Sequence, residues 1–433
     1  MDKVIDICTR VEGHGNLNFV FKNEELSHTE FTFSLYRGFE NILIGKKLCD
    51  VPKIVSRICG LCYSSQTIAS CKAIEDIYEI EPSIQSILLR KLLMTSELIK
   101  SHLLHFFFQT LPDLLKILDI NRYINNAYDI FNNNDQFTSN VYNLLKISSD
   151  INRLIGGRVI HPITVIPGGV INNPEKKNLL LIQKYLKRAK DYAQDLIEYF
   201  ITLFSKYNPP NEYDLSKLSF LGLSNENIHS RYEGNIIIKQ LESKPQLFAP
   251  HNYQDFFNKD QELYGINFHT IKDSKVLTGP YSRFNIKNYY SNDLISEYIN
   301  QFEKPWKTNL LFINLLQLIE IFLEIIQNLE TINDDLISSK WNITSLKAIK
   351  NRDGIGVVEA PRGLLMHHYH IDNDQRIDGV KLYIATEINL PIINEMIAKY
   401  AQELFLKHDI NTVKDKVQIM LRAFDPCISC LSH

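Results

Sequence analysis

The chain has 433 residues, of which 45% are hydrophobic and 22% are charged, and its formal net charge is −3. This much apolar sequence can build one extended core or two smaller ones. A near-neutral charge gives no strong electrostatic footprint for nucleic acid or for an anionic membrane surface, so we expect neither as a partner.

Cysteine usage and the N-terminal sequence favour a reducing compartment. The seven cysteines are an odd number, and no N-terminal run joins basic residues to an apolar segment, so we expect no disulfide framework and no secretion signal. Cytoplasm is the expected location. The apolar stretch 310–323 is interrupted by Asn, Gln and Glu and falls short of the ~20 apolar residues of a spanning helix. We therefore expect no membrane span.

The predicted elements form a strand-rich head over about residues 1–80, a helical middle over about 83–340 and a mixed C-terminal part over about 341–433. Apolar and polar residues partly alternate from Asn16 to Leu35 around a Lys-Asn-Glu-Glu turn, which predicts a hairpin. Apolar residues at helical spacing predict three long helices that pack on one another. These span Ser83–Leu111, Pro174–Tyr207 and Trp306–Leu336.

Two connecting regions are less informative. A loop punctuated by glycine and proline runs from Gly156 to Gly169, between the first two predicted helices. The polar stretch 208–293 is rich in Tyr and Asn and gives no interpretable chemistry. We find no internal repeat.

Two cysteine pairs carry the strongest chemical signal. They are Cys59 and Cys62 in Arg57-Ile-Cys-Gly-Leu-Cys62, and Cys427 and Cys430 in Asp425-Pro-Cys-Ile-Ser-Cys430. Four thiolates can form a soft site for nickel, iron, zinc or copper. A structural zinc site or a redox pair is the usual meaning of an isolated Cys-x-x-Cys. The wide separation of these pairs instead predicts a metal site that ties both ends of a domain together. The remaining cysteines, which lack paired spacing, are expected to be buried small hydrophobic residues: Cys8, Cys49 and Cys71.

Several further motifs occur in order along the chain. They are Arg10-Val-Glu-Gly-His14, Arg37-Gly-Phe-Glu40, Ser101-His-Leu-Leu-His105 leading to Pro112-Asp113, Gly156-Gly-Arg-Val-Ile-His-Pro162 with Pro167-Gly-Gly169, and Glu359-Ala-Pro-Arg-Gly363. With both cysteine pairs, they make the chain resemble, from end to end, the large catalytic subunit of a nickel-iron hydrogenase. The short length, Ala69-Ser-Cys-Lys-Ala73 and Asp425-Pro-Cys-Ile-Ser-Cys430 look most similar to cytoplasmic archaeal-type enzymes, which pass electrons to a deazaflavin or another soluble acceptor.

The resemblance implies a single domain over residues 1–433 with a mainly helical α+β fold, in which a long central helix bundle is flanked by small peripheral β-sheets. It also implies reversible heterolytic cleavage of dihydrogen by a nickel-iron cluster with carbon monoxide and cyanide ligands on iron. No further cysteines are arranged for iron-sulfur clusters, so an iron-sulfur small subunit is the expected electron acceptor. A flavin- or deazaflavin-linked subunit, a maturation protease and nickel-insertion proteins are further expected partners.

The resemblance also implies the ligands. In the family, the first cysteine of each pair is a terminal nickel ligand and the second bridges nickel to iron, so Cys59 and Cys427 are expected to be terminal, and Cys62 and Cys430 bridging. The diatomic ligands need an apolar pocket with a few donors, in which backbone amides and a threonine hydroxyl receive the cyanides. The matching positions are Ala360, Pro361, Leu365, Ile384, Ala385 and Thr386.

Arg362 matches the guanidinium that lies over the open coordination position, where it can polarise dihydrogen. Asp113 and Asp425 are expected to orient it. Heterolysis also releases a proton, for which the Cys427 thiolate is the expected first acceptor and Glu12 the gate to the exterior. A carboxylate that caps a helix or a turn is an equally good interpretation of Glu12 on sequence alone.

Glu40 and His433 match a second, hard metal site, usually magnesium, completed by the Leu382 carbonyl and water. A surface or ion-paired acid is the alternative for Glu40. Family precursors often extend beyond this histidine and are trimmed after nickel insertion, so an ending at His433 is expected of a mature chain or of one without an extension.

Gln66 departs from the family pattern. The family usually has a histidine four residues after Cys62, where it donates a hydrogen bond to the bridging sulfur. Glutamine can donate but cannot carry a proton or charge, so we expect an assembled cluster with altered redox tuning or oxygen response. Five histidines in or near the motifs are expected to be buried and hydrogen bonded rather than metal ligands: His14, His102, His105, His161 and His367.

Three other functions remain open on sequence alone. A non-catalytic dihydrogen sensor would keep the cluster, and Gln66 is its only hint. A metal-free scaffold of the complex I type would keep the fold, but retention of all four paired cysteines, Arg362, Glu40 and His433 argues against it. A structural zinc protein is the third possibility.

Overall fold

The computed structural model describes all but a few short segments of the chain. The described residues are 2–33, 38–120, 126–132, 135–224, 231–240, 244–260, 265–268, 275–286, 292–332 and 342–431. Four positions named in the sequence predictions lie outside these ranges: Leu35, Arg37, Leu336 and His433.

The N-terminal region combines a small sheet with helices. The strands β1 (Asp2–Ile7), β2 (Gly15–Lys22) and β3 (Glu25–Phe33) pair antiparallel in that order, which confirms the predicted hairpin. Its two turn residues, Asn23 and Glu24, have positive φ angles, as two-residue hairpin turns require. The strand-rich region is shorter than predicted, because helices follow it: α1 (Phe39–Leu43), η1 (Leu48–Asp50), α2 (Val51–Val55) and α3 (Tyr63–Tyr78).

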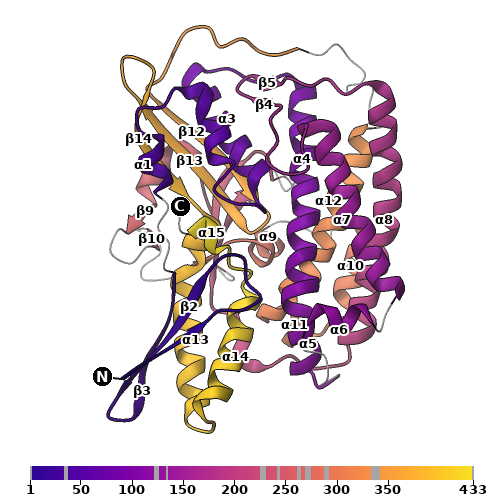
Figure 1. Cartoon of the computed structure of the whole chain (residues 1–433), viewed down its shortest axis with the longest axis vertical. Coiled ribbons are helices and arrows are strands. Elements are labelled where there is room, and N and C mark those ends of the chain that lie inside the picture. Colours follow the sequence, from indigo (N-terminus) through magenta and orange to yellow (C-terminus); the bar gives the residue numbers. More distant parts are fainter. Residues whose placement is uncertain are drawn as a thin grey trace.

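Four long helices form a bundle along one side of the molecule (Figure 1). They are α4 (Ile84–Leu103), α7 (Asp135–Gly156), α8 (Lys176–Phe204) and α12 (Ile313–Ile332). Helices α4 and α8 each contact both α7 and α12, so the four close around a shared core. The first two predicted helices are confirmed as α4 and α8. The third is interrupted, since α11 (Lys304–Lys307) and η6 (Leu310–Phe312) precede α12.

Helix α4 begins where the sequence predicted and itself ends at Leu103, but further helical segments continue beyond the expected end at Leu111. The Ser83 hydroxyl accepts a hydrogen bond from the Ser86 amide at the N-cap. After Leu103 the chain passes through a π-helical segment, η2 (Leu104–Thr110), into α5 (Leu111–Ile117), followed by α6 (Ala127–Phe131). Such π segments occur often at functional sites, and η2 carries the Phe106 to Phe108 stripe into the core.

One helix, Leu310–Ile332, is long and apolar enough to cross a membrane by length and composition, with a mean hydropathy of 1.9. Its most apolar window is 89% buried inside the protein, among the other helices of the bundle. The side chains that break its apolar run are buried as well. It is therefore packed as the core helix of a globular body.

The polar stretch after α8 forms short strands and helices that join the bundle to the C-terminal region. β11, β6, β7 and β8 make one sheet in that spatial order, and two further strand pairs are small. Of these strands, β4 (Val165–Ile166) and β5 (Gly169–Val170) precede α8. The elements after α8 are η3 (Asn211–Tyr213), β6 (Ser219–Ser224), β7 (Asn235–Gln240), β8 (Gln246–Phe248), η4 (Pro250–Asp255), β9 (Phe257–Asp260), β10 (Gly265–Phe268), β11 (Val276–Leu277), α9 (Pro280–Ile286) and α10 (Asp293–Asn300).

The C-terminal region is an antiparallel meander followed by helices. Its elements are β12 (Asp353–Ala360), β13 (Gly363–Ile371), β14 (Ile377–Tyr383), α13 (Ala385–Phe405), α14 (Ile410–Ala423) and α15 (Ile428–Leu431). Helix α3 lies directly on β12. A Cβ atom at Gly356 would come within 1.9 Å of the Ala69 carbonyl oxygen, and one at Gly354 within 2.1 Å of the Ala73 carbonyl oxygen. The small residues of Ala69-Ser-Cys-Lys-Ala73 and of β12 therefore permit this close approach.

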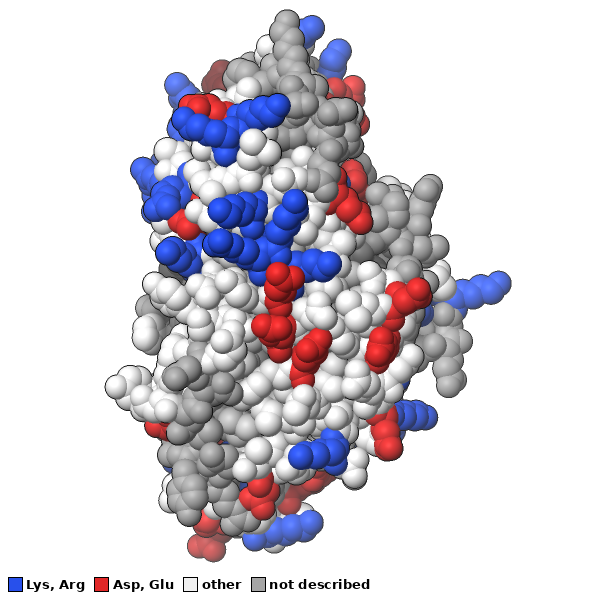
Figure 2. All heavy atoms as spheres, turned by 90° about the vertical axis from the view of Figure 1, so that its right-hand side faces the viewer, with Lys and Arg blue, Asp and Glu red and all other residues white. Residues whose placement is uncertain are grey.

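This packing determines where the two ends of the chain meet. In Figure 1 the short helix α15 lies at the lower end of the β12–β14 sheet, above α13, and α3 lies against that sheet. The four paired cysteines belong to one continuous buried core that extends into the bundle. On the outer face, which Figure 2 shows, lysine and arginine side chains gather in one band. Helix α8 lies on that side of the molecule, and its Lys184, Lys187 and Arg188 are exposed.

Candidate metal centre

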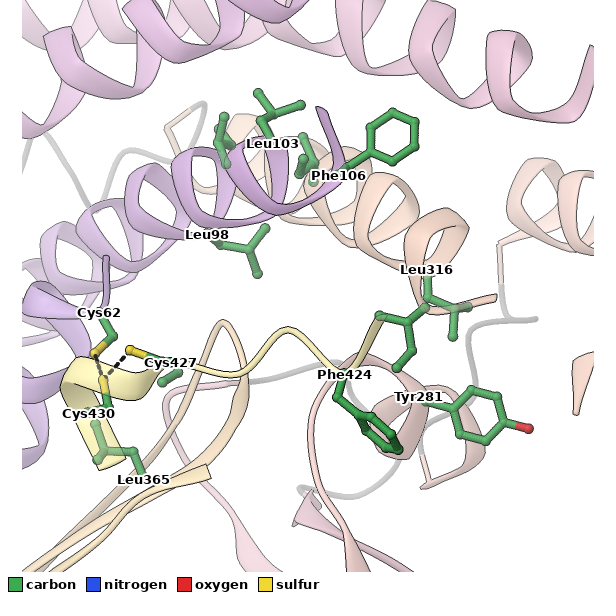
Figure 3. Close-up of a cluster of buried hydrophobic side chains, with 14 of the residues drawn as sticks. Cys62, Leu98, Leu103, Phe106, Tyr281, Leu316, Leu365, Phe424, Cys427 and Cys430 are labelled. Carbon is green, nitrogen blue, oxygen red and sulfur yellow. Dashed lines mark hydrogen bonds between the residues drawn. The ribbon is translucent and has the colours of Figure 1, made fainter. Parts of the chain in front are cut away.

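The four thiols of the two cysteine pairs converge in the core. The Cys59 and Cys427 sulfurs are 3.3 Å apart, those of Cys62 and Cys430 are 3.1 Å apart, and Cys427 and Cys430 are 2.7 Å apart. All four side chains are buried. Figure 3 shows three of them at the edge of an apolar cluster, with Leu365 beside Cys430. The predicted meeting of the two ends of the chain is therefore found in the structure.

Turns at the ends of helices position these thiols. Cys62 is the N-cap residue of α3, and the Leu61 amide donates a hydrogen bond to the Cys59 sulfur at 3.2 Å. The second pair follows α14 and enters α15, where the Ile428 amide donates to the Glu12 carbonyl at 2.9 Å. The start of the chain thus holds the second cysteine pair in place. Each Cys-x-x-Cys presents both sulfurs to the same point because one short turn separates them.

The thiol cluster favours a cation. Burial opposes ionisation, yet hydrogen bonds from the other three thiols and the charge of Arg362 lower the pKa of Cys59 well below its usual value. Burial raises the pKa of Cys427 and of Cys430 well above it. A bound metal ion replaces such thiol protons, because coordination stabilises the thiolate.

Arg362 lies in the turn between β12 and β13 and is held by Asp425. Its Nε donates to the Asp425 carbonyl and to its Oδ1, both at 2.9 Å, and its Nη1 donates to the Ser101 hydroxyl at 3.1 Å. Burial works against the charge, but Asp425 and the nearby Cys427 and Cys59 raise the pKa of Arg362 well above its usual value. The guanidinium is therefore a fixed, permanent charge beside the thiols.

Asp113 has a different set of partners. Its Oδ2 accepts from Arg422 Nε at 2.6 Å, and its Oδ1 forms an ion pair with Arg10. In the described part of the chain, the contacts of Arg362 are with Asp425 and Ser101 instead. This corrects the expectation that Asp113 orients Arg362, and Ser101 takes that place. Ser101 stood inside a motif that the sequence had singled out, but the motif alone did not show which residue reaches the guanidinium.

A second buried ion pair fixes the backbone next to Arg362. Arg283 forms a bidentate pair with Glu320, with distances of 2.6 and 2.7 Å. The same guanidinium donates to the carbonyls of Ala360 and Pro361, at 3.3 and 2.8 Å. Although burial works against ionisation, Arg283 holds the pKa of Glu320 well below its usual range. Neither Arg283 nor Glu320 was predicted. Glu320 could have been noticed, because it is a charged residue inside the apolar stretch 310–323.

The predicted diatomic-ligand pocket lies beside the thiols. Ala360 ends β12 and Pro361 follows it, Leu365 is on β13, and Ala385 and Thr386 begin α13 after its N-cap residue Ile384. The Thr386 hydroxyl accepts a hydrogen bond from the Cys427 amide at 3.1 Å, so these residues lie at the second cysteine pair. All six side chains are buried.

Glu12 contacts the cluster directly. Its Oε2 lies 3.1 Å from the Cys427 sulfur and accepts from the Ser429 amide at 3.0 Å. Its side chain is partly exposed, so this carboxyl lies between the buried thiols and the outside. The contact with the Ser429 amide fits the interpretation of Glu12 as a carboxylate that caps a turn, and its role as the proton gate stays a prediction.

Glu40 and Leu382 are neighbours at the open edge of β14. Glu40 Oε1 accepts from the Leu382 amide at 2.7 Å. The amide and carbonyl of one residue in an antiparallel strand point to the same edge, so the Leu382 carbonyl also points away from β13. His433, the third predicted member of this site, lies outside the described residues.

Gln66 lies on α3 one turn beyond Cys62. Its amide nitrogen is 3.9 Å from the Cys62 sulfur, and its Oε1 accepts from His367 Nε2 at 2.8 Å. The other ring nitrogen of His367 lies 2.6 Å from the Tyr369 hydroxyl. Because the amide oxygen only accepts, His367 carries its proton on Nε2, and the Tyr369 hydroxyl donates to Nδ1. This chain of hydrogen bonds directs the Gln66 amide protons toward the sulfur.

Most of the other predictions for single residues are confirmed. His102, His105 and His367 are buried and hydrogen bonded, whereas His161 contacts the Ser56 carbonyl but is only partly buried. His14 is exposed, so its predicted burial is wrong. Cys8 and Cys71 are buried as expected, but Cys49 is exposed, because it lies in the short helical turn η1 at the surface.

The residues present fit a soft metal site. Three sulfurs, those of Cys59, Cys62 and Cys430, have ligand atoms within 4.8 Å of one another, and so do Cys59, Cys427 and Glu12. Arg362 Nη2 forms an ion pair with Asp425 Oδ1 at 2.7 Å, but among the described residues this buried donor has no well-aligned hydrogen-bond acceptor. Buried donors are normally satisfied, so this guanidinium has capacity for a further ligand.

Comparison with known proteins identifies the family. The profile of the family described as nickel-dependent hydrogenase matches residues 37–213 and 307–433, which hold both cysteine pairs and Arg362. The chain belongs to the nickel-dependent hydrogenase family. As a hydrogenase it is an oxidoreductase, and the four thiols are the donors expected for its nickel-containing centre.

Relatives of this hydrogenase are similar over nearly their whole length. One is a component of the F420-non-reducing hydrogenase vhc of Methanococcus voltae, which is 28% identical, and the match covers 99% of this chain and 94% of that protein. The NAD-reducing hydrogenase HoxS subunit beta of Cupriavidus necator is 27% identical with the same coverage. The predicted likeness to archaeal enzymes is thus confirmed.

Solved structures show the same fold. An NAD+-reducing NiFe-hydrogenase in the H2-reduced state has a TM-score of 0.91 and is 20% identical, with full coverage of both chains. The Ni-Fe-Se hydrogenase from D. vulgaris Hildenborough has a TM-score of 0.72, also at 20% identity and full coverage. The predicted mainly helical α+β hydrogenase large-subunit fold is confirmed.

Proposed function

We propose that this chain is the catalytic subunit of a nickel-iron hydrogenase that cleaves dihydrogen reversibly into protons and electrons. The observation that carries the proposal is the convergence of four buried thiols with the Arg362 guanidinium and the Glu12 carboxylate. A structural zinc site needs the thiols alone. Heterolytic cleavage requires two further groups beside the thiols: a permanent cation, here Arg362, and a partly exposed acid, here Glu12. No observation favours a purely regulatory role.

Each of these residues has a role in that reaction. When bound, the nickel-iron pair supplies the site at which dihydrogen is polarised and its electrons are taken up. Arg362, locked by Asp425 and Ser101, presents a positive charge that does not need to reorient during the reaction. The Cys427 sulfur receives the proton, and Glu12, 3.1 Å away, carries it outward. Cys59 and Cys427 would hold the nickel as terminal ligands, and Cys62 and Cys430 would hold both metals.

The start of α13 supports the proposed diatomic ligands. The first amides of a helix have no intrahelical acceptors, and the helix dipole favours negative charge there. Ala385 and Thr386 supply such amides next to Cys427. Cyanide is an anion that accepts hydrogen bonds, whereas the neighbouring Leu365 and Pro361 give carbon monoxide an apolar surface.

A magnesium ion is proposed at Glu40 and Leu382, with His433 and water completing its coordination. Glu40 supplies a carboxylate, and the Leu382 carbonyl points to the same side of β14. Hard oxygen ligands of this kind suit magnesium. The ion would tie the C-terminal end of the chain to the edge of the sheet.

Metal analysis with infrared spectroscopy tests the proposed function. The chain is purified after co-expression with hydrogenase maturation proteins, and nickel, iron and zinc are quantified. We expect equal amounts of nickel and iron, together with bands in the carbon monoxide and cyanide stretching region. Zinc without such bands would contradict the proposal. An intact cluster with very slow turnover of dihydrogen would favour the alternative function, that of a non-catalytic dihydrogen sensor.

Replacing Gln66 with histidine is expected to shift the reduction potential of the cluster. The Gln66 amide is fixed by His367 and donates to the bridging Cys62, and donors to ligand sulfur tune its basicity. A histidine can add a proton and a charge at this position. Potentials, oxygen response and turnover are compared with those of the native chain, and identical values would rule the tuning role out. His367→Phe is the matched variant, which frees the amide while leaving Gln66 in place.

The iron-sulfur small subunit is proposed to dock on the loop beside the first cysteine pair. Val159, Ile160, Ile163 and Ile171 expose apolar side chains there, each between 37% and 48% exposed. We call these four residues the loop patch. The Val159 carbonyl is 3.4 Å from the Tyr63 hydroxyl, and Tyr63 directly follows Cys62. A partner on this patch would therefore take electrons at short range, and clustered apolar side chains are a mark of an interface.

Ile160→Asp is expected to abolish stable association with the small subunit. A charge in the core of an interface is costly to desolvate, and a few central side chains of an interface each carry about 2 kcal/mol or more of its binding free energy. Copurification of the tagged chain with the co-expressed partner measures the effect. Leu406→Asp is the control, because Leu406 is 84% exposed on α13's C-cap and lies outside the loop patch. Equal association of both variants would place the interface elsewhere.

The electron acceptor beyond the small subunit is a separate proposal. Relatives of similar coverage are named NAD-reducing and F420-non-reducing hydrogenases, so we propose a flavin-linked subunit over a deazaflavin-linked one. Assays with NAD+ and with deazaflavin distinguish them.

A maturation protease, nickel-insertion proteins and a cytoplasmic location stay predictions from the sequence.

A further inference from the structure

His105 is a fully buried residue that the proposed reaction does not use. It lies in the π-helical segment η2, and its side chain has no solvent exposure. Its Nε2 is 2.8 Å from the Arg422 carbonyl oxygen, and its Nδ1 is 2.8 Å from Gln317 Oε1. Asp425 Oδ2 lies 3.9 Å from Nδ1. Both ring nitrogens thus have a close oxygen partner.

These partners determine how many protons the ring holds. A backbone carbonyl only accepts, so Nε2 must carry a proton. Gln317 Nε2 donates to Asp425 Oδ2 at 3.1 Å, which turns the Gln317 oxygen toward His105. The reversed amide would set that oxygen against a carboxylate already paired with Arg362. Nδ1 therefore faces an acceptor as well, and it must also carry a proton.

We propose that His105 is a buried imidazolium and a positioning residue for Arg362. The order of groups is Arg362, Asp425, Gln317 and His105, so one carboxylate lies between two cations. The other nearby charge, Arg422, is balanced by Asp113. Burying a cation is costly unless it is paired and hydrogen bonded, and both conditions hold here. The charge state stands on these contacts alone, whereas the positioning role rests on the proposed function.

This arrangement is not a proton path. The Arg422 carbonyl accepts from His105 but has no proton to pass on, so the chain of hydrogen bonds ends there. His105 therefore acts through Gln317, by holding the Asp425 carboxylate in the orientation that fixes the guanidinium beside the thiols. Loss of its charge should alter the electrostatic field at the metals without blocking proton exit.

His102 provides an internal comparison one helical turn away. It is equally buried, but only its Nε2 has an acceptor, Glu320 Oε2 at 3.0 Å. Among the described residues, its Nδ1 has no partner. Burial lowers the pKa of His102, so this ring is expected to be neutral. Two histidines of equal burial thus differ in the number of acceptors that they face.

Nitrogen NMR of the full chain tests the charge state without any cluster. The metal-free protein is labelled with ¹⁵N histidine, and signals are assigned by their loss in His105→Gln and His102→Gln. Because His105 faces an oxygen acceptor at each ring nitrogen and His102 at only one, we expect His105 to show two protonated ring nitrogens and His102 only one. A neutral pattern for His105 would overturn the proposal. If neither variant folds, the absence from the native chain of any imidazolium signal that is protected from exchange with solvent would overturn it equally.

The positioning role is tested on the loaded enzyme. In His105→Gln, one hydrogen bond is retained but the charge is lost, so we expect the carbon monoxide band and the reduction potential to shift while nickel and iron content stay unchanged. A doubly protonated His105 with unaltered band and potential would overturn the positioning role. Failure of the proposed function would instead show as missing nickel in the native chain, and it would leave the NMR result intact.

Discussion

Replacing Arg362 with lysine is expected to lower dihydrogen oxidation by about 10² to 10³-fold. Nickel and iron content should stay unchanged, since no cysteine ligand is altered. The arginine uses Nε and Nη2 for Asp425 and Nη1 for Ser101. An ammonium group has the charge but not this planar fork. It would bind Asp425 and withdraw from the thiols, and the reaction would lose its fixed charge.

The measurement is turnover per nickel, with infrared bands to show that the cluster is assembled. Arg231→Lys is the matched control, because Arg231 is also buried and also makes several bonds, to Glu324 and to the Glu359 and Met94 carbonyls. Ser101→Ala should reduce turnover only about tenfold, in line with loss of one hydrogen bond to a charged group. Full activity of the Arg362 variant would mean that the guanidinium has no role in cleavage.

The cysteine pairs were predictable because their spacing is local. A Cys-x-x-Cys turn directs both sulfurs to one point whatever surrounds it, so only the meeting of Cys59 and Cys62 with Cys427 and Cys430 depended on the fold. The order of the motifs along the chain supplied that information. The residues that support the site were harder to predict, because their partners are set by tertiary packing.

Asp113 and Ser101 illustrate this difference. Both lie in one sequence motif, but the intervening π-helix and α-helix turn Asp113 toward Arg422, whereas Ser101 faces Arg362. Helical spacing does not reveal a π segment, which adds residues to a turn. By charge alone, a carboxylate such as Asp113 is the expected partner of Arg362, but the Ser101 hydroxyl contacts the guanidinium instead.

Helix α7 shows a signal that was present but not used. Its apolar residues recur at helical spacing, from Phe137 through Val141, Leu144, Ile151 and Ile155, and all five are buried. Numerous Asn and Ser residues between them resemble a loop in composition. The strands of the polar stretch 208–293 were not predicted for a different reason. They are short, and a strand of a few residues carries too little alternation to be recognised.

Replacing Glu12 with glutamine is expected to slow turnover by about 10² to 10⁴-fold, the range typical of a lost acid-base group. Glutamine keeps an oxygen for the Ser429 amide, which lies 3.0 Å from the native carboxylate, so the turn that holds Cys427 should persist. What disappears is the ability to take a proton from the sulfur 3.1 Å away. Glu12→Asp keeps the acid but withdraws it by one methylene, so an intermediate rate is expected.

Two assays separate proton exit from cleavage. Conversion of para- to ortho-hydrogen needs only cleavage and recombination within the site, so the glutamine variant should retain it. Exchange of deuterium gas with solvent protons needs the exit, and it should fall together with turnover. If both exchange and turnover persisted in Glu12→Gln with an intact cluster, protons would leave by another route, and Glu12 would be only the acid that binds the Ser429 amide.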